Sequence, residues 1–325
     1  MPQRNMVEAI NSALAEEMEA DPRVMVLGLD VGKLGGVFRT TSGLRDRFGS
    51  ERVVDTPLAE ASIVGAALGL ALAGMVPVAE IQFLGFTAQA FHQIGPQLGK
   101  YRQRSRGRYH CQVTIRAPFG GGIRSPEFHA DAVEAQFVQM PGVKIVMPSN
   151  PYDAKGLLIE AIRDPDPVLF CEPARLYRAG RAEVPDGTYT LPFGKAALVR
   201  EGDQITLVAW SAAVELCLRA ADVLAGEGMS AAVLDLRTLV PLDIETLCTQ
   251  VANTGRCVIV HEAPLSAGFG AEVSATLMEE VFYDLDAPVV RVGAFDVPFP
   301  AAVLEDYYLP SLDRVVQAVK RTLVS

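Results

Sequence analysis

Segments of two kinds alternate along the whole chain. In residues 5–20 apolar side chains recur every three or four positions, which indicates an amphipathic helix, and residues 23–27 are a short apolar run. Continuous runs of Val, Ile and Leu are typical of strands buried on both faces of a parallel sheet. The alternation therefore predicts an α/β fold with a parallel sheet covered by helices on both sides. Further strands are expected at residues 52–54, 76–81, 111–115, 143–147, 167–171, 205–210, 231–236, 257–261 and 289–292, and further helices at 41–48, 61–74, 88–101, 151–163, 212–227, 244–254, 271–283 and 312–323.

The alternation is interrupted once, near the middle of the chain. Residues 178–193 are a polar run that contains Pro185, Gly187 and Pro192, and runs of this kind commonly separate domains. We interpret the chain as an α/β domain, a linker and a second, smaller α/β domain. Their expected bounds are residues 1–180, 181–192 and 193–325.

Composition narrows the classes of partner and compartment. The chain carries 39 acidic and 29 basic residues, a net charge of −10, and has no basic run with interleaved aromatic residues. Neither nucleic acid nor an anionic membrane surface is therefore an expected partner. The five cysteines are scattered and form no C-x-x-C pair, which indicates free thiols in a reducing compartment. The amino terminus has no apolar signal core, and we expect a cytoplasmic protein.

Residues 61–79 carry no charged side chain, with Glu60 directly before them. Three glycines and Pro77 make a membrane-spanning helix a poor interpretation, so we predict a buried helix followed by a buried strand. Gly65 and Gly69 lie four positions apart and leave one face of that helix bare. Another surface can pack very close to it.

Two interpretations of Glu60 stay open on its local sequence. It can be an acidic residue that the helix dipole favours at the first turn. Alternatively, it is an ionisable group at the edge of an apolar surface, whose protonation is set by a specific partner rather than by water.

Several common catalytic and phosphate-binding motifs are missing. The sequence has no G-x-x-x-x-G-K-[ST] loop, no G-x-S-x-G elbow and no H-E-x-x-H. The three glycines at residues 120–122 follow a strand but continue as Ile-Arg-Ser-Pro, which does not begin a helix cleanly, so they do not match a dinucleotide-binding loop. A Gly-Asp-Gly with a downstream Asn, which would hold Mg²⁺ and a diphosphate, is also missing. This chain alone is not expected to bind a nucleotide-sized phosphate group.

Polar residues that could do chemistry follow the predicted strands of the first domain. Open α/β sheets bind their ligands at the carboxyl ends of the strands, which favours a shared site there. A single histidine in a loop is also typical of a structural role. The candidates are Glu60, Gln82, the loop at residues 116–122 and His129, with Phe83 and Phe86 as aromatic surface beside Gln82.

A series of motifs, in order, covers nearly the whole chain. It begins with Asp-Thr-Pro-Leu-Ala-Glu at residues 55–60 and continues at 80–83, 113–122, 129–131, 151–158, 162–167, 235–238, 241–243, 261–263 and 287–291. With these motifs the chain resembles the β subunit of the E1 component of 2-oxo acid dehydrogenase complexes. Residues 83–86 and 126–131 look more like the pyruvate dehydrogenase β subunits of the bacterial α2β2 type than like branched-chain enzymes.

The resemblance implies a pyrimidine-binding domain followed by a transketolase-type C-terminal domain. Thiamine diphosphate would lie between an α subunit, which holds Mg²⁺ and the diphosphate, and this chain, which holds the aminopyrimidine. The missing Gly-Asp-Gly motif agrees with that division. By the family's pattern, Glu60 hydrogen-bonds the pyrimidine N1′ and favours the imino tautomer, whereas Phe86 stacks on the ring. Leu58 and Gln82 line the same pocket, and His129 is the acid/base candidate for acyl transfer to lipoamide.

The implied reaction is oxidative decarboxylation of pyruvate and transfer of the acyl group to lipoyl-E2. The implied enzyme is an α2β2 heterotetramer that is active only with its α subunit, and E2 would contact it through lipoyl and subunit-binding domains. A branched-chain 2-oxo acid dehydrogenase stays an alternative, as does a non-catalytic subunit that only anchors E1 to the E2 core. A self-contained transketolase-like enzyme is disfavoured by the chain length and the missing diphosphate site.

The family's β subunits also often hold a structural K⁺. An acidic turn at residues 164–166 accounts for part of the same pattern without an ion. The residues on which the ion would fall are Val113, Thr114, Ala161, Asp164 and Asp166.

One position departs from the family's pattern. Leu29 stands where an acidic residue is usual, which puts a polar contact near the subunit interface in doubt. In the second domain His261 and Glu262 end a strand, and we interpret this pair and Trp210 as structural.

Overall fold

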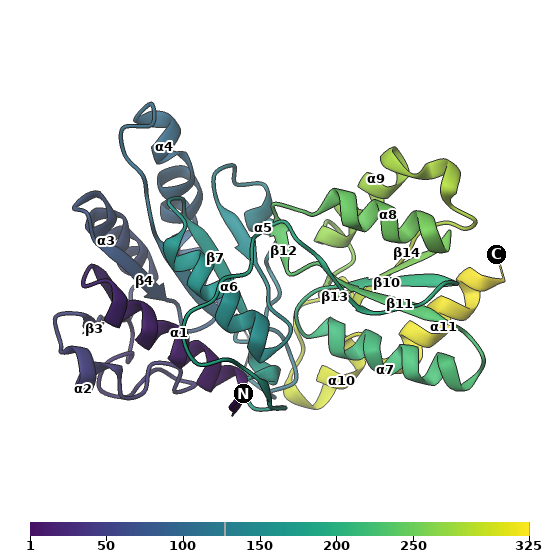
Figure 1. Ribbon diagram of the computed structural model, residues 1–325, viewed down its shortest axis with the longest axis horizontal. Helices are drawn as coiled ribbons and strands as arrows, with labels where there is room; N and C mark the ends of the chain where they lie inside the picture. Colours follow the sequence, from purple (N-terminus) through teal and green to yellow (C-terminus); the bar gives the residue numbers. More distant parts are fainter. Residues whose placement is uncertain (127, 325) are drawn as a thin grey trace.

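A seven-stranded sheet forms the centre of the amino-terminal half of the chain in the computed structural model, which describes residues 1–126 and 128–324 (Figure 1). Its strands are β2 (Val24–Gly28), β3 (Val53–Asp55), β4 (Val76–Glu80), β5 (Thr114–Phe119), β6 (Lys144–Val146), β7 (Val168–Pro173) and β12 (Thr238–Val240). Their order is β12-β6-β7-β5-β4-β2-β3, and all neighbours are parallel except β12, which runs antiparallel to β6. Every residue of β2, β4, β5 and β7 is buried, as expected for strands covered on both faces.

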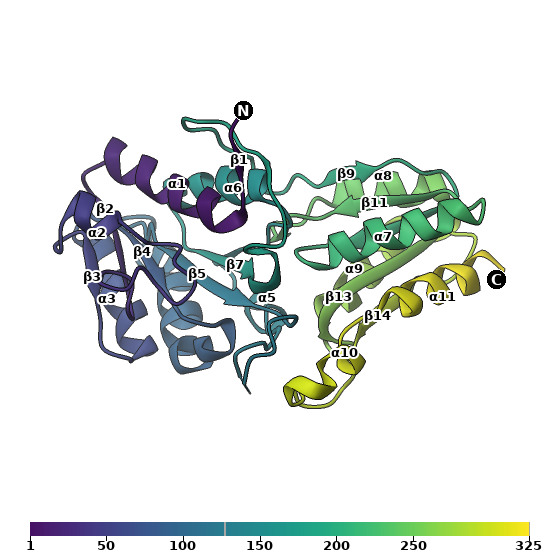
Figure 2. The same ribbon diagram turned by 90° about the horizontal axis from the view of Figure 1, so that it is seen from below.

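Helices cover both faces of this sheet (Figure 2). On one face α1 (Met6–Ala20) packs against α6 (Pro151–Arg163), and α3 (Glu60–Leu72) lies on the other. The start of α1 is fixed by a capping box, in which Asn5 and Glu8 each accept the backbone N–H of the other at 2.9 Å. The shorter helices are α2 (Leu44–Phe48), η1 (Leu84–Ala90), η2 (Gln93–Gly99), α4 (Lys100–Arg104), α5 (Ala135–Val138) and η3 (Ala174–Leu176).

The carboxyl-terminal half has a five-stranded sheet of its own, in the order β14-β13-β10-β11-β9. Its strands are β9 (Ala197–Arg200), β10 (Ile205–Ala209), β11 (Ala231–Asp235), β13 (Cys257–Pro264) and β14 (Val290–Ala294). β9 is antiparallel to β11, whereas the other neighbours are parallel. One face packs on α7 (Ala213–Gly226) and α11 (Leu312–Leu323), the other on α8 (Ile244–Thr254) and α9 (Phe269–Glu280). The short helices η4 (Phe282–Asp284), η5 (Ala302–Leu304) and α10 (Glu305–Tyr308) complete this half.

The two halves share strands and core. β12 comes from the carboxyl-terminal half in sequence but pairs with β6 of the first sheet. One hydrophobic cluster contains Phe137 and Met140 from the first half together with Trp210 and Phe269 from the second. This confirms our interpretation of Trp210 as a core residue. Because residues of both halves pack in one cluster, this packing fixes how the two halves are oriented.

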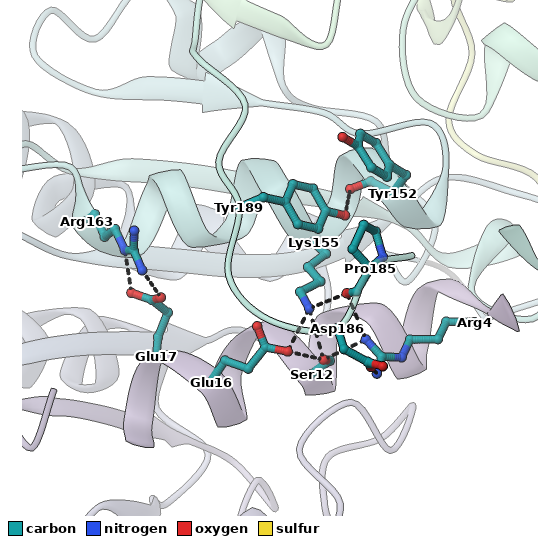
Figure 3. A network of polar contacts seen from close by, with 10 residues as sticks. All are labelled: Arg4, Ser12, Glu16, Glu17, Tyr152, Lys155, Arg163, Pro185, Asp186 and Tyr189. Carbon is teal, nitrogen blue, oxygen red and sulfur yellow. Dashed lines mark hydrogen bonds and ion pairs between the residues drawn. The ribbon is translucent and has the colours of Figure 1, made fainter. Parts of the chain in front are cut away.

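The segment expected to be a linker is held firmly against the first half. Within it β8 (Ala182–Glu183) pairs antiparallel with β1 (Gln3–Arg4). Behind this pair the fully buried Lys155 ammonium contacts Glu16 at 2.6 Å and donates to the carbonyl oxygen of Pro185 at 2.9 Å (Figure 3). Because a buried charge is stable only with its partners in place, this network fixes the path of the chain between the halves.

Most predicted elements are present, but two predictions of secondary structure in the first half are wrong. Residues 116–119 were expected in a loop, whereas they are the second part of β5 and fully buried. The sequence misleads here because Arg116 looks like a surface residue, and only its ion pairs with two distant carboxylates allow it inside a strand. The helix predicted at residues 88–101 is a succession of 3-10, π and α turns, because Pro96 lacks the N–H that a regular α-helix needs.

Strands β1, β8, β9 and β12 were not predicted, since each is short and carries no clear alternation. All five cysteines are free thiols, as the sequence indicates. Among the described residues no helix is both long enough and apolar enough to cross a membrane.

Candidate functional site

The candidate residues lie at the carboxyl edge of the first sheet. Glu60 begins α3 directly after β3, and Gln82 follows β4. β2 lies between these two strands and is parallel to both, so all three carboxyl ends meet at one edge. Leu29, the departure from the family's pattern, is half-buried directly after β2 at the same edge.

Glu60 is half-buried, and its carboxylate has no hydrogen bond or ion pair within residues 1–126 and 128–324. Asp55, the other carboxylate of the same turn, differs sharply from it. Asp55 accepts the backbone N–H groups of Gly32 at 2.6 Å and Lys33 at 3.1 Å, and Arg45 lies 2.6 Å from it. Asp55 thus has a structural role, whereas the Glu60 carboxylate is left without a partner among residues 1–126 and 128–324.

The prediction that α3 is a buried helix is wrong for this chain by itself. Of its residues Ile63, Val64 and Ala67 are buried against the sheet. The opposite face carries no charge and is exposed; it consists of Ser62, Ala66 and Gly69, and Ala73 just beyond the helix continues it. Leu58, which precedes the helix, is 69% exposed. The apolar pattern of α3 predicts that the whole helix is buried within this chain, but a pattern of apolar residues does not specify what covers each face.

An aromatic cluster lies next to Gln82. The His129 ring packs edge-on against Phe83, with centroids 4.5 Å apart, and against Phe86 at 5.0 Å. The two phenylalanines are themselves 5.7 Å apart. Gly85 permits this approach, because a Cβ at that position would lie 2.5 Å from the carbonyl oxygen of Phe128. The structure therefore brings His129 to Phe86, and both lie at half-buried positions, as does Gln82, the sequence neighbour of Phe83.

Beneath this edge is a buried ion cluster that the sequence analysis did not assign. Arg116 pairs with Glu80 at 2.7 Å and with Glu172 at 2.7 Å, and Tyr177 donates to Glu172 at 2.5 Å. Burial raises the pKa of the Glu80 carboxyl, against the opposite effect of Arg116. Burial opposes the charge of Arg116, but its two carboxylates prevail and raise its pKa. The sequence offers one indication of this cluster, because Arg116 is the only charged residue in the mostly apolar run of residues 113–119.

The residues expected around a K⁺ ion lie near one another, with several partners already in place. Lys144 contacts both carboxylate oxygens of Asp164 at 2.6 Å, and Arg102 contacts Asp166 at 2.6 Å. The buried Thr114 hydroxyl has no hydrogen-bond partner in the described part of the chain. Within the same described part, no group of three or more His, Cys, Asp or Glu side chains could hold a metal ion. Val113 and Ala161 are buried beside them, and their carbonyl groups would have to supply further oxygens.

Comparisons with known proteins agree with the two-part architecture. The family model of the transketolase pyrimidine-binding domain matches residues 3–180, and that of the transketolase C-terminal domain matches residues 194–315. Among solved structures, a protein described as "split gene transketolase, inactive beta4 tetramer" has a TM-score of 0.81 and 28% identity over 99% of both chains. A transketolase from Leishmania mexicana shares the fold, with a TM-score of 0.71 and 19% identity over 100% of this chain and 46% of that one.

Proteins related in sequence identify the family of this chain more specifically. The proteins named pyruvate dehydrogenase E1 component subunit beta from Staphylococcus epidermidis and Bacillus subtilis are each 49% identical to this chain over 323 residues, 99% of the chain and 99% of each relative. The protein of the same name from Staphylococcus aureus is 47% identical over the same length. Full-length similarity at this level, together with both domain models, shows that the chain belongs to the family of pyruvate dehydrogenase E1 component β subunits.

Proposed function

We propose that this chain is the β subunit of a thiamine-diphosphate-dependent pyruvate dehydrogenase E1. The enzyme would decarboxylate pyruvate oxidatively and pass the acyl group to the lipoyl group of E2. The observation that carries the proposal is the 49% identity over 323 residues with β subunits of that name. Chemical support comes from two separate observations: a half-buried Glu60 at the carboxyl edge of the first sheet, and the ring contact between His129 and Phe86.

The residues of this chain would supply one half of the cofactor site. Glu60 would hydrogen-bond a ring nitrogen of the aminopyrimidine, Phe86 would stack on the ring, and Leu58 and Gln82 would line it. Their fit to such a group is supported by the Glu60 carboxylate, which has no partner in the described part of the chain, and by exposed apolar surface on Leu58. When bound, thiamine diphosphate supplies the electron sink for the electron pair that departing CO₂ leaves behind.

Two of these side chains would handle protons. Excluding water from a carboxyl group favours its neutral, hydrogen-bond-donating form. In this proposal that exclusion at Glu60 comes from a second subunit, since this chain leaves Glu60 half-buried. His129 would be the general acid and base during acyl transfer, a task for which imidazole is the commonest side chain.

An α subunit is the proposed partner at α3. Support comes from the exposed, uncharged face of α3, where small side chains let another backbone approach closely. The α subunit would bring Mg²⁺ and the diphosphate site, for which this sequence has no motif. We propose an α2β2 heterotetramer in the cytoplasm that docks E2 through its lipoyl and subunit-binding domains.

A structural K⁺ is part of the same proposal. The Thr114 hydroxyl, which has no hydrogen-bond partner among the described residues, supports it, whereas Asp164 and Asp166 are each already paired with a side-chain cation. The donors left for an ion would then be largely neutral oxygens, including the carbonyl groups of Val113 and Ala161, and alkali and alkaline-earth cations prefer oxygen ligands.

The division of the chain at residues 181–192 is proposed as well. It is supported by the two family models, which match residues 3–180 and 194–315. Because β12 pairs across the division, these are units of sequence that fold together.

The test is 2-oxo acid-dependent dye reduction by this chain with its α subunit, thiamine diphosphate and Mg²⁺. Pyruvate and 2-oxoisovalerate would be compared for the wild type, Glu60→Ala, Glu60→Gln and the control Glu51→Ala, which changes an exposed acid of the same half. We expect activity that needs the α subunit, prefers pyruvate and falls by roughly 100-fold or more in both Glu60 variants.

The alternatives give different results. A preference for 2-oxoisovalerate would assign the branched-chain reaction instead. Wild-type turnover in Glu60→Ala would refute the catalytic role of Glu60, and absence of any 2-oxo acid-dependent activity would favour an anchoring subunit.

A further inference from the structure

Three consecutive glycines follow β5, and the backbone there is held by carboxylates from the other half of the chain. The N–H of Gly121 donates to Oε2 of Glu262 at 3.2 Å, and the N–H of Gly122 donates to Oε1 of Glu305. The N–H of Arg124 donates to Oε2 of Glu305 at 3.1 Å. Successive amides of this kind form a concave anion-binding nest. Here the anions are the chain's own carboxylates.

The close fit accounts for the glycines. Gly120 and Gly122 have φ of +85° and +94°, a backbone conformation that other residues rarely adopt. A Cβ at position 120 would lie 2.5 Å from Oε2 of Glu262, and a Cβ at Gly121 would lie 2.8 Å from Oε1 of Glu305. Gly120 and Gly121 are thus explained by contact with the second half, whereas a Cβ at Gly122 would lie 2.9 Å from the side chain of Arg175 in the first half.

The two carboxylates differ in what else they contact. Glu262 has a strong cationic partner, since Arg175 lies 2.7 Å from its Oε1. Glu305 is 0% exposed, and its nearest cation is the Arg124 guanidinium at 3.8 Å. Backbone amides are therefore its main stabilising partners, and removing Glu305 leaves two N–H groups without acceptors.

The chain that this contact holds leads directly to His129. Arg124 and Phe128 both have positive φ, +54° and +66°, which is strained for residues with a Cβ. Strained backbone of this kind persists where the surroundings hold it in place. Beyond it the His129 ring packs on Phe83 and Phe86. Glu305 thus holds the backbone at Gly122 and Arg124, the second of which lies five positions before His129 in the sequence.

We propose that Glu305 is a positioning residue, through which the carboxyl-terminal half sets the location of His129 for acyl transfer. The proposal rests on the proposed function, because it assigns His129 the proton transfer to or from the acyl acceptor. Glu305 acts on the loop and touches neither substrate nor cofactor. Its loss is expected to impair acyl transfer more than decarboxylation, since Glu60 is on another segment and Phe86 is held by its own helix η1.

The experiment separates the two half-reactions in the assembled α2β2 enzyme. Dye reduction reports decarboxylation, and reductive acylation of a free lipoyl domain reports the transfer step. We expect Glu305→Ala to lower the transfer rate by roughly 10-fold to 100-fold while dye reduction and the KM for pyruvate change little. Glu305→Gln keeps one acceptor oxygen and is expected to recover part of the loss. The control is Asp306→Ala, which removes an exposed neighbouring acid that pairs with Arg124 at 2.6 Å and contributes little.

Hydrogen exchange of the glycine loop is measured on the same variants. Faster exchange together with a selective, Gln-recoverable loss of transfer supports the proposal. Unchanged exchange, or equal loss of both half-reactions, overturns it. If the wild type shows no 2-oxo acid-dependent activity, the proposed function fails, and exchange alone then decides whether Glu305 holds the loop. Should Glu305→Ala not fold, Glu305→Gln gives the same comparisons with smaller differences.

Discussion

Glu134 is a buried carboxyl group at the junction of the two halves, and replacing it with glutamine gives a sharp test of the structure. It is 1% exposed and lies directly before α5. The indole N–H of Trp210 donates to its Oε1 at 3.4 Å, whereas Oε2 has no hydrogen-bond partner among residues 1–126 and 128–324. Burial raises the pKa of Glu134 to about 7.

The size and sign of the effect follow from that pKa. The difference between the ordinary value of 4.5 and about 7 corresponds to about 3 kcal/mol. The folded-state pKa is the higher one, so the unfolded chain releases this proton first as the pH rises. Below about pH 4.5, Glu134 is protonated in both states and does not lower the free energy of unfolding. Between about pH 4.5 and pH 7 the unfolded chain loses the proton more readily than the folded chain, so the free energy of unfolding falls progressively. Above that pH the folded state carries the full cost of a buried charge.

Glu134→Gln is neutral at every pH and keeps an oxygen for the Trp210 N–H. We expect the free energy of unfolding of the variant, relative to the wild type, to increase by about 2 kcal/mol between pH 5 and pH 8. The assay is urea unfolding of both proteins at each pH and at one protein concentration. Asp235, whose pKa burial raises to about 7, also titrates in this range, but it is common to both proteins and cancels.

The matched control is Glu51→Gln, an exposed acid for which the difference should not depend on pH. A difference between Glu134→Gln and wild type that stays constant from pH 5 to pH 8 would refute the reasoning. Glu134 would then be hydrated or ionised in the folded chain. Infrared detection of a protonated carboxyl that disappears in the variant checks the same point without unfolding.

Three further predictions concern stability and are read from urea unfolding midpoints. Arg116→Met leaves two buried carboxylates unpaired and is expected to cost about 3–5 kcal/mol, and a cost below about 1 kcal/mol would contradict the buried cluster. Gly142→Ala is expected to cost several kcal/mol, because its Cβ would overlap the carbonyl of Gly99. The control Gly43→Ala is also at positive φ but in open space, and it should cost about 1 kcal/mol. Equal costs of the two substitutions would refute the steric argument. Asn5→Ala removes the capping box and is expected to cost about 1 kcal/mol, and no measurable change would show that the cap is dispensable.

Local pattern was enough for much of the fold. Apolar runs and helical periods predicted α1, α6, α7 and the central strands of both sheets, because burial on both faces leaves no room for polar residues. The same reasoning located Glu60 at the start of a helix and Gln82 after a strand, both at one edge of the sheet. The proposed cofactor site depends on those two positions.

Other features depend on contacts between segments far apart in the sequence. Nothing local to β12 indicates that it pairs with β6, because strand pairing depends on which edge is left open after folding. Arg116 becomes a strand residue only because Glu172, on a neighbouring strand, neutralises it inside the sheet.

The sequence by itself determined the two α/β halves, the uncharged helix that begins at Glu60, the free thiols and the absence of a diphosphate motif. Periodicity and composition depend only on which residues are neighbours in the sequence, so they can be assessed without a structure. The tertiary structure decided which apolar face of α3 is left uncovered and where His129 lies. It also decided that Glu305 accepts the N–H of Gly122, a contact between residues 183 positions apart. Charge and close packing act through space, and their partners are chosen only when the chain has folded.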